Sequence, residues 1–336
     1  MKKIGLIIFC LVILFGCNSK KSTKLNKKDY LTFFKKIKGK GCVSGQFIRW
    51  SYNASLEEMK KANELSGQWV GMLGADYYGN FRDSVPSPKG IYQKANQAIK
   101  EYYPKNGLVN LSLHINNPQS GASAWDYVID IDSIFIPNSR VQKNLLKELD
   151  FIAEGIADLE EKGVMVMFRP YHEMNGYWFW WGKSKRFAEL WKFTYKYLVE
   201  EKKLDNMLWC WSPDAGPGNI HDYYPGDEYV DIVGLDSYGA DLPKKALDDY
   251  KEILKYNKPF GFSEYGCVQG GDKKTAATFD YSVLKDWLHK EFPEAVYFLV
   301  WRDHWGFTGK KGVDVLLNDD KILNKESIME LKTIKQ

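Results

Sequence analysis

Eight short apolar runs, most of them rich in β-branched residues, alternate with amphipathic stretches along residues 42–332. Such runs are typical of parallel strands buried on both faces, and the amphipathic stretches have the spacing of helices. The expected strands are residues 42–46, 69–75, 109–115, 164–170, 207–212, 230–235, 260–263 and 296–301. The expected helices are residues 55–65, 89–102, 138–162, 184–201, 242–256, 274–290 and 323–332, and the connection around 220–228 is short and poorly helical. This alternation predicts an α/β fold, and eight strands with intervening helices favour a (β/α)8 TIM barrel.

A single domain is expected for residues 29–336, because no break in composition divides them. The alternative fold is a doubly wound open sheet, but no Gly-x-Gly-x-x-Gly motif follows the first expected strand. The first expected helix opens with Ser55-Leu-Glu-Glu58, which has the spacing of a capping box. Ser55 is therefore expected to cap that helix.

The N-terminal residues have the pattern of an export signal. A short basic start precedes an apolar run, residues 4–15, that is too short to span a membrane as a helix. Its ending, Leu14-Phe15-Gly16-Cys17, resembles a bacterial lipobox, which implies cleavage before Cys17 and lipidation of the Cys17 sulfur. We therefore expect a lipoprotein signal peptide at residues 1–16, a polar tether at residues 17–28 and an exported, membrane-anchored protein. An N-terminal anchor that is never cleaved is the alternative. The tether has no acidic residue, which favours the periplasmic face over the cell surface.

The charges of the remaining chain give no reason to expect nucleic acid as a partner. Residues 1–28 hold seven lysines and no acid, whereas residues 29–336 carry 40 basic and 43 acidic side chains. Three cysteines remain in this part, Cys42, Cys210 and Cys267, and none has the spacing of a metal site. They are expected to be buried small hydrophobes.

Polar side chains follow the apolar strands, where a barrel carries its reactive groups. They lie in the segments 114–118, 171–173, 212–214, 236–239, 264–266 and 302–303. Glu173 follows the fourth expected strand and Glu264 follows the seventh, each flanked by aromatic residues rather than by other charges. Two carboxyl groups facing across a cleft are what glycoside hydrolysis needs, since one protonates the leaving oxygen and the other attacks the anomeric carbon.

The segment around Glu173 resembles a known signature. Arg169-Pro-Tyr-His-Glu-Met-Asn-Gly-Tyr-Trp-Phe-Trp-Trp-Gly182 is similar to the motif of glycoside hydrolase family 26, the β-mannanase family. The resemblance extends over roughly residues 40–330. It implies a (β/α)8 barrel of the clan whose catalytic glutamates stand on strands four and seven.

Residue by residue, the resemblance assigns Glu173 to the acid/base and Glu264 to the nucleophile. It places His172 near the nucleophile and the sugar 2-hydroxyl, and it gives Tyr238 a hydrogen bond to the nucleophile. Further substrate-binding positions match His114 and Trp125 in the wall of the −1 subsite, Trp178 beside the acid/base, Trp301 beneath the −1 sugar, and Arg302 at the −2 sugar.

Several polar and aromatic residues remain open between a functional and a structural role. Asp76, after strand two, is a weak match for a residue that contacts the −1 sugar. Asp236 has the alternative role of bracing the loop after strand six, and Arg169 that of a buried structural cation that pairs with the carboxylates. Trp180 and Trp181 alternate with Trp178, so some of this cluster must face the barrel wall, and Trp180 is open between core and site. Trp209 and Trp211 on strand five are open in the same way. His221, His289 and His304 are expected at the surface or behind the site. A zinc site is not expected, because no His stands four residues after His172.

The expected activity is that of a retaining endo-β-1,4-mannanase, a monomer that needs no cofactor or metal and acts on β-mannan polysaccharide or manno-oligosaccharides. The first alternative keeps this chemistry on β-glucan or β-xylan. The second is a lipoprotein that binds glycans without cleaving them. The presence of both glutamates argues against the second alternative.

Overall fold

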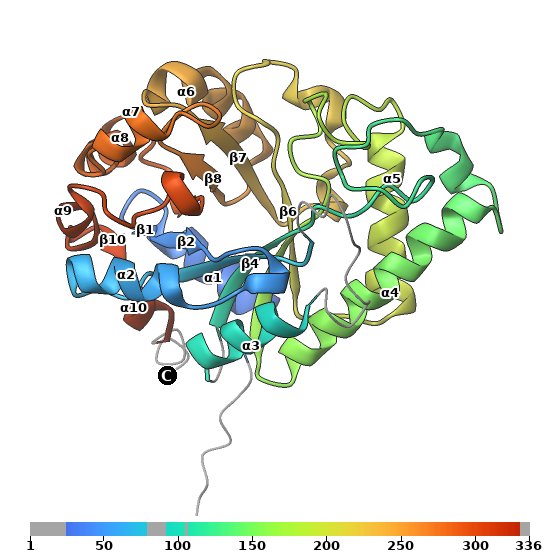
Figure 1. The fold of residues 1–336 in the computed structure, drawn as a ribbon, viewed down its shortest axis with the longest axis horizontal. Coiled ribbons are helices and arrows are strands. Elements are labelled where there is room, and N and C mark those ends of the chain that lie inside the picture. Colours follow the sequence, from blue (N-terminus) through green and yellow to red (C-terminus); the bar gives the residue numbers. More distant parts are fainter. Residues whose placement is uncertain (1–24, 79–91, 105–106, 330–336) are drawn as a thin grey trace, which may run out of the picture.

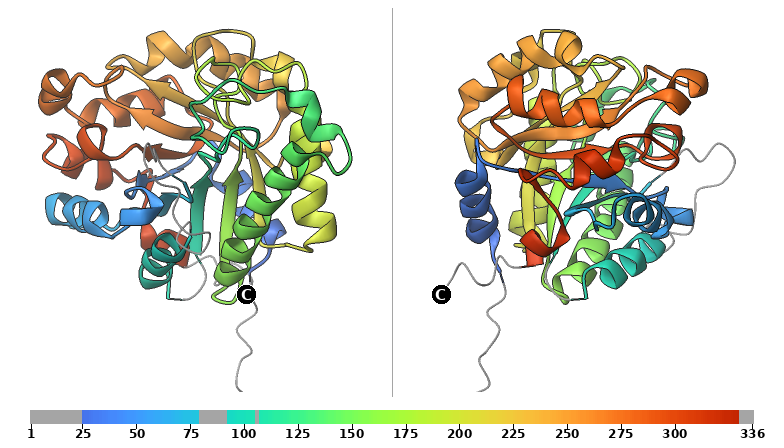
Figure 2. Two further views of the ribbon diagram at one scale, coloured as in Figure 1. Left: turned by 45° about the vertical axis from the view of Figure 1, so that its right-hand side comes forward. Right: turned by 90° about the vertical axis from the view of Figure 1, so that its left-hand side faces the viewer.

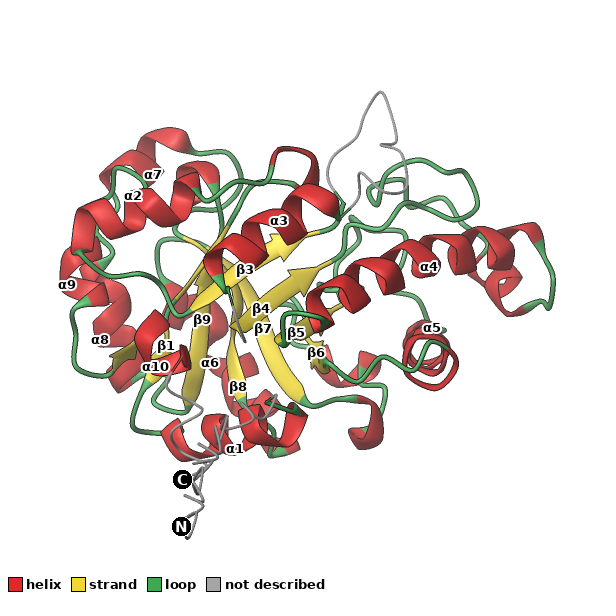
Figure 3. Ribbon diagram, turned by 90° about the horizontal axis from the view of Figure 1, so that it is seen from below, coloured by secondary structure: helices red, strands yellow, loops and turns green. Residues whose placement is uncertain are grey.

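Parallel strands closed into a barrel form the centre of the molecule, and helices surround them (Figures 1 and 3). The computed structural model describes residues 25–78, 92–104 and 107–329. The barrel strands are β1 (Cys42–Val43), β2 (Gly45–Phe47), β3 (Met72–Asp76), β4 (Gly107–Ser112), β5 (Val164–Arg169), β6 (Met207–Trp211), β7 (Ile232–Tyr238), β8 (Phe260–Gly266) and β9 (Ala295–Val300). From β2 to β9 each strand pairs in parallel with the next, and β9 also pairs with β1 and with β2, which closes the ring. The predicted (β/α)8 barrel is confirmed.

The first barrel position is divided between two short strands, β1 and β2, because Ser44 interrupts the ladder. β1 also pairs with an added strand, β10 (Ile322–Leu323), which the sequence pattern did not predict. The other seven predicted strands are confirmed, with bounds that shift by up to three residues.

The helices are α1 (Lys27–Ile37), α2 (Glu57–Ser66), α3 (Gln93–Tyr102), α4 (Arg140–Glu160), α5 (Phe187–Tyr195), α6 (Leu242–Ile253), α7 (Lys273–Thr278), α8 (Ser282–Lys290), α9 (Val313–Leu317) and α10 (Lys325–Met329). A π-helical stretch, Lys196–Glu201, extends α5. The weakly helical connection after β6 consists of two 3-10 turns, Ile220–Tyr223 and Asp227–Tyr229, as expected.

Two predictions about helices are wrong. Residues 274–290 do not form one helix, since Asp280 bridges Lys311 and the Tyr281 N–H donates to the Lys311 carbonyl at 2.8 Å. That pairing separates α7 from α8. Ser55 does not cap α2, since no side chain in the described part of the chain caps that helix, and Glu58 instead accepts a hydrogen bond from Thr308 at 2.7 Å.

The buried apolar residues form two clusters, as a barrel requires. The larger one lies between the strands and the surrounding helices, and the smaller one fills the inside of the barrel. Helix α1, which was not predicted and overlaps the expected tether by two residues, belongs to the inner cluster through its buried Tyr30, Phe33, Phe34 and Ile37. The Tyr30 hydroxyl donates to the carbonyl of Gly107, the first residue of β4, so α1 covers the amino end of the barrel (Figure 2).

Cys42, Cys210 and Cys267 are buried free thiols, which agrees with the expected role as small hydrophobes. The expected signal peptide and the lipidated Cys17 lie outside the described residues. None of the helices in the described part combines the length and apolar character needed to cross a bilayer.

Candidate active site

A cleft of about 360 Å³ opens at the carboxyl ends of the strands, within the range of about 300–1,000 Å³ that is usual for small-ligand sites. Both candidate carboxyl groups, Glu173 and Glu264, line it. Aromatic rings make up much of the remaining wall: Trp50, Trp125, Trp178, Phe179, Tyr238, Trp301 and Trp305. A cleft of apolar faces with a few polar groups suits a ligand that has flat apolar faces and many hydroxyls.

Glu173 stands on a strained turn directly after β5. Its φ is +52°, and that of Tyr171 is +53°, in the left-handed region that non-glycine residues seldom adopt. The turn is held because the Glu173 N–H donates to the Ser212 carbonyl at 2.8 Å. The indole N–H of Trp178 donates to Glu173 Oε2 at 2.5 Å. Gly176 permits this contact, since a Cβ at that position would overlap the Trp178 ring. Backbone strain of this kind is typical of functional sites.

Glu264 reaches the cleft because β8 is irregular at this point. Leu235 pairs with Phe262 but Asp236 pairs with Glu264, so one extra residue, Ser263, is accommodated in β8. The Ser263 hydroxyl contacts the Tyr297 hydroxyl inside the barrel at 2.8 Å, and Glu264 also faces inward. A bulge is what allows two consecutive side chains to point to the same side of a strand.

Three side chains surround the Glu264 carboxylate. Tyr238 donates its hydroxyl proton to Oε2 at 2.5 Å, and Arg169 donates to Oε1. His172 Nε2 lies 3.8 Å from the same Oε1. Burial, with Glu264 and Glu173 nearby, raises the pKa of Tyr238 well above its ordinary value, so Tyr238 stays a donor. A Cβ at Gly266 would overlap the Tyr238 ring, which explains the glycine after Glu264-Tyr265.

Arg169 is fully buried and pairs with two carboxylates, Glu264 and Asp236. Burial alone would lower the pKa of Arg169, but the two carboxylates raise it, so the guanidinium is charged. Asp236 also accepts a hydrogen bond from Ser212 at 2.6 Å. His172, Asp236 and Glu264 offer ligand atoms within 4.8 Å of one another, yet Arg169 already supplies the positive charge that a metal ion would bring there.

The two glutamates differ in environment. Glu173 is 8% exposed and has no cationic partner among the residues that the structure describes. Burial, together with Glu264, Asp236 and Asp214, raises the pKa of Glu173 well above its ordinary value, against the opposing effect of Trp178. Glu264 has the guanidinium of Arg169 against one of its oxygens. A protonated carboxyl group beside a paired carboxylate is the combination that separates an acid from a nucleophile.

His114, Trp125 and His172 form one wall of the cleft. The His114 ring stacks on Trp125 with centroids 4.9 Å apart, and it meets His172 edge to face at 4.7 Å. Asp76 lies behind this wall, where it bonds His114 Nδ1 at 2.6 Å and fixes the ring. Burial, Arg169 and His114 lower the pKa of His172 well below its ordinary value, so its ring is neutral.

Trp301, Arg302 and Trp50 form the end of the cleft next to this wall, since the Trp50 ring meets His114 edge to face with centroids 5.0 Å apart. The Arg302 guanidinium lies 3.7 Å from the centre of the Trp50 ring, and Arg302 also pairs with Asp303. Trp301 packs against Phe47, with centroids 4.5 Å apart. One face of this end is thus aromatic and its edge carries a positive charge.

Comparison with known proteins decides the family. The sequence model of the family described as glycosyl hydrolase family 26 matches residues 18–327, which is most of the chain. The chain belongs to glycosyl hydrolase family 26. It is 34% identical over 300 residues to a mannan endo-1,4-beta-mannosidase of Bacillus subtilis (strain 168), covering 85% of this chain and 81% of that protein.

Two further relatives support the assignment of this chain to family 26. A mannan endo-1,4-beta-mannosidase A and B of Caldalkalibacillus mannanilyticus is 34% identical over 326 residues, which cover 93% of this chain and 62% of that longer protein. The solved structure of the Bacillus subtilis mannanase BCman superposes with a TM-score of 0.81 at 31% identity, covering 90% of this chain and 94% of that one. The family and the barrel expected from the motif are therefore confirmed, and the protein is a glycoside hydrolase.

The structure brings all the expected site residues of this family 26 enzyme to one cleft: Glu173, Glu264, His114, Trp125, His172, Trp178, Tyr238, Trp301 and Arg302. Asp76 is not among the lining residues, because it lies behind His114. Trp180, Trp209 and Trp211 are buried in the core, and Arg169 is the buried cation that the sequence suggested. His221 and His289 pair with Glu252 and Asp319, and His304 packs on Trp305.

Sequence reasoning missed several lining residues. Trp50 stands three residues after β2, so attention to aromatic residues at strand ends would have found it. Phe179 lies inside the recognised motif. Asp214 belongs to the segment 212–214 that was expected at the strand ends, although no role was assigned to it. Lys245, Gln269 and Trp305 carry no motif, and only the fold brings them to the cleft.

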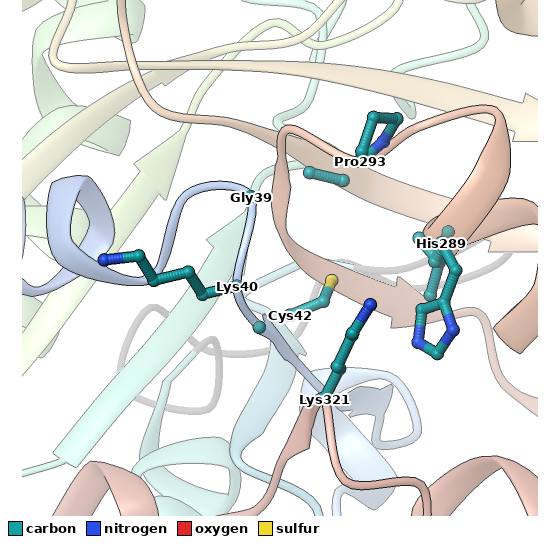
Figure 4. A pocket seen from close by; sticks show the side chains of 9 residues that line it. Gly39, Lys40, Cys42, His289, Pro293 and Lys321 are labelled. Atoms are coloured by element: carbon teal, nitrogen blue, oxygen red, sulfur yellow. The ribbon is translucent and has the colours of Figure 1, made fainter.

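A second hollow lies at the amino end of the barrel, around Gly39, Cys42, His289 and Lys321 (Figure 4). It holds about 30 Å³, which is enough for a water molecule and far too little for a sugar. Two other hollows, of about 400 and 440 Å³, lie around Leu56 and around Leu25 and are not lined by either glutamate. The cleft of about 360 Å³ is the candidate active site because both glutamates and the aromatic wall line it.

Proposed function

We propose that this family 26 enzyme is a retaining endo-β-1,4-mannanase that cleaves mannan, galactomannan or glucomannan. The observation that carries the proposal is the pair of glutamates, which enter one cleft from β5 and β8 and differ in charge environment. The relatives named as mannan endo-1,4-beta-mannosidases support the substrate.

In the first step, a Glu264 carboxylate oxygen attacks the anomeric carbon of the −1 sugar. The bond to the leaving oxygen breaks, and Glu173 gives that oxygen its proton. The raised pKa of Glu173 favours the protonated form that this step needs. The hydrogen bonds from Tyr238 and Arg169 orient the Glu264 carboxylate for attack.

In the second step, Glu173 has become a carboxylate and takes a proton from water. The water oxygen attacks the anomeric carbon, the ester bond to Glu264 breaks, and the sugar leaves with its original configuration. The Trp178 N–H donates to Glu173 and stabilises the carboxylate form that acts as base. His114, Trp125, His172 and Trp301 are proposed to hold the −1 sugar, and Arg302 the −2 sugar.

The substrate class is tested by measuring reducing-sugar release from mannan, lichenan and xylan. We expect mannan to be cleaved fastest, with internal cuts giving a mixture of oligosaccharides from mannohexaose. Faster release from lichenan or xylan would replace mannan by β-glucan or β-xylan. Binding of mannan without release of any sugar would indicate a glycan-capturing protein instead.

Lipid anchoring of the exported chain at Cys17, with the enzyme at the periplasmic face, is also part of the proposal. The lipobox-like sequence before Cys17 supports it. Wild-type cells fed labelled palmitate should yield a labelled protein in the membrane fraction, and Cys17→Ser should be unlabelled. Recovery of soluble wild-type protein with an unmodified Cys17 would contradict the anchor. The enzyme is expected to be a monomer, which its sedimentation velocity would test.

A further inference from the structure

An ion pair lines the active-site cleft beside Glu173, and neither of its members has been assigned a contact with the substrate. Lys245 Nζ lies 3.2 Å from Asp214 Oδ1, and both residues are among those that line the cleft. The Asp214 side chain is 13% exposed and that of Lys245 is 24% exposed. Both side chains are thus largely withdrawn from solvent, unlike an ordinary surface pair.

The backbone of Asp214 is fixed to the turn that carries Glu173. Asn175 Oδ1 accepts from the Asp214 N–H, and Asn175 Nδ2 donates to the Asp214 carbonyl, both at 2.8 Å. The bond from the Glu173 N–H to Ser212 joins the same two segments. The position of Asp214 relative to the proposed acid/base is therefore determined by three hydrogen bonds.

Lys245 is held from the other side by α6. The Gly216 N–H donates to Asp249 of α6 at 2.6 Å, which ties the loop after β6 to the helix that bears Lys245. The Lys245 side chain then passes over Gly216, where an added Cβ would lie 3.6 Å from Lys245 Cε. The ammonium group is thus positioned by a built contact rather than by a flexible surface side chain.

The chemistry identifies which part of the substrate lies near this pair. An acid that protonates the leaving oxygen must stand on the side of the leaving group, and Glu173 is the proposed acid. Trp301 and Arg302, proposed for the −1 and −2 sugars, follow β9, whereas Asp214 follows β6, and β7 and β8 lie between these two strands in the barrel. The Asp214–Lys245 pair is therefore on the side of the departing sugar.

We propose, on the basis of the proposed function, that Lys245, positioned by Asp214, binds hydroxyl groups of the sugar on the leaving-group side and thereby favours oligosaccharide over simple leaving groups. An ammonium group has three donors, and Asp214 occupies one of them. The remaining donors suit the vicinal hydroxyls of a neutral sugar.

The test compares a leaving group that is a sugar with one that is not. The ratio of kcat/KM for mannotetraose to that for 4-nitrophenyl β-mannobioside should fall about tenfold in Lys245→Met, the loss expected for one hydrogen bond to a charged donor. Lys245→Arg keeps charge and donors, so most of the wild-type ratio should remain. Lys244→Met is the matched control, because Lys244 is the exposed neighbour on the same helix and does not line the cleft.

Two results would overturn the inference. One is a Lys245→Met enzyme with a lower Tm and an unchanged substrate ratio, which would give the pair a purely structural role. The other is an equal fall for both substrates. If the wild type cleaves mannotetraose, either result refutes only this inference. If the wild type cleaves no mannoside, the proposed function fails first and the inference falls with it.

Discussion

Replacing Trp178 by Phe should move the pH dependence of the enzyme in a direction that the structure determines. Trp178 Nε1 donates to Glu173 Oε2 at 2.5 Å, and this bond favours the carboxylate form of Glu173. A hydrogen bond to a charged group contributes about 1.5–3 kcal/mol, and one pKa unit corresponds to about 1.4 kcal/mol. Trp178 is 36% exposed, so water will replace part of the lost bond. We therefore expect the pKa of Glu173 to rise by about one unit.

The consequence for catalysis has a definite sign. Glu173 must carry a proton to act on the leaving group, and a higher pKa keeps that proton to higher pH. The alkaline limb of kcat/KM against pH, measured on soluble galactomannan, should move up by about one unit in Trp178→Phe. Trp125→Phe is the control, because Trp125 faces the same cleft and stacks on His114 without a hydrogen bond to Glu173 in the described structure. An unmoved limb, or one displaced to lower pH, would refute the reasoning.

Glu264→Ala should lose all activity, because it lacks the nucleophile. Glu173→Ala should still turn over aryl mannosides with good leaving groups, show a burst of released aryl alcohol and be rescued by azide. If the two variants respond alike to leaving group and azide, the assigned roles are wrong. Arg169→Met leaves two buried carboxylates without a cation, so the free energy of unfolding, measured by urea denaturation at pH 7, should fall by about 3–5 kcal/mol. An unchanged free energy of unfolding would contradict the pairing. Arg302→Ala should lower the ratio of kcat/KM for mannotriose to that for polymer, since other subsites can compensate on a long chain. A lower Tm with a constant ratio would instead make Arg302 only a partner of Asp303.

The barrel could be predicted from the sequence because each buried parallel strand is visible as a continuous run of apolar residues. The runs before Glu173 and Glu264 are continuous and apolar, and the polar residues after them had no packing reason to stand there. Their convergence could be inferred because the carboxyl ends of barrel strands share one face.

Other features depend on contacts that no local pattern encodes. The break between α7 and α8 arises from the pairing of Asp280 and Tyr281 with Lys311, which lies some thirty residues away. Glu58 takes no part in the expected capping box, because its carboxylate accepts a hydrogen bond from Thr308 instead. Lys245 reaches the cleft from α6, which is tied to the loop after β6 by the hydrogen bond between Gly216 and Asp249. In each case a tertiary contact decided the local structure, and the family signature gave no sign of it.

Helix α1 separates the two ends of this molecule. It closes the barrel where the strands begin, through Tyr30 against Gly107 and an ion pair between Lys27 and Asp231, while the glutamates stand where the strands finish. Whatever is joined to the chain ahead of α1, whether a lipid, a fusion partner or a solid support, is thereby attached behind the catalytic face. A long polysaccharide could then cross the cleft without meeting the attachment, and immobilisation through the N-terminus should leave turnover of polymer and of short oligosaccharides equally intact.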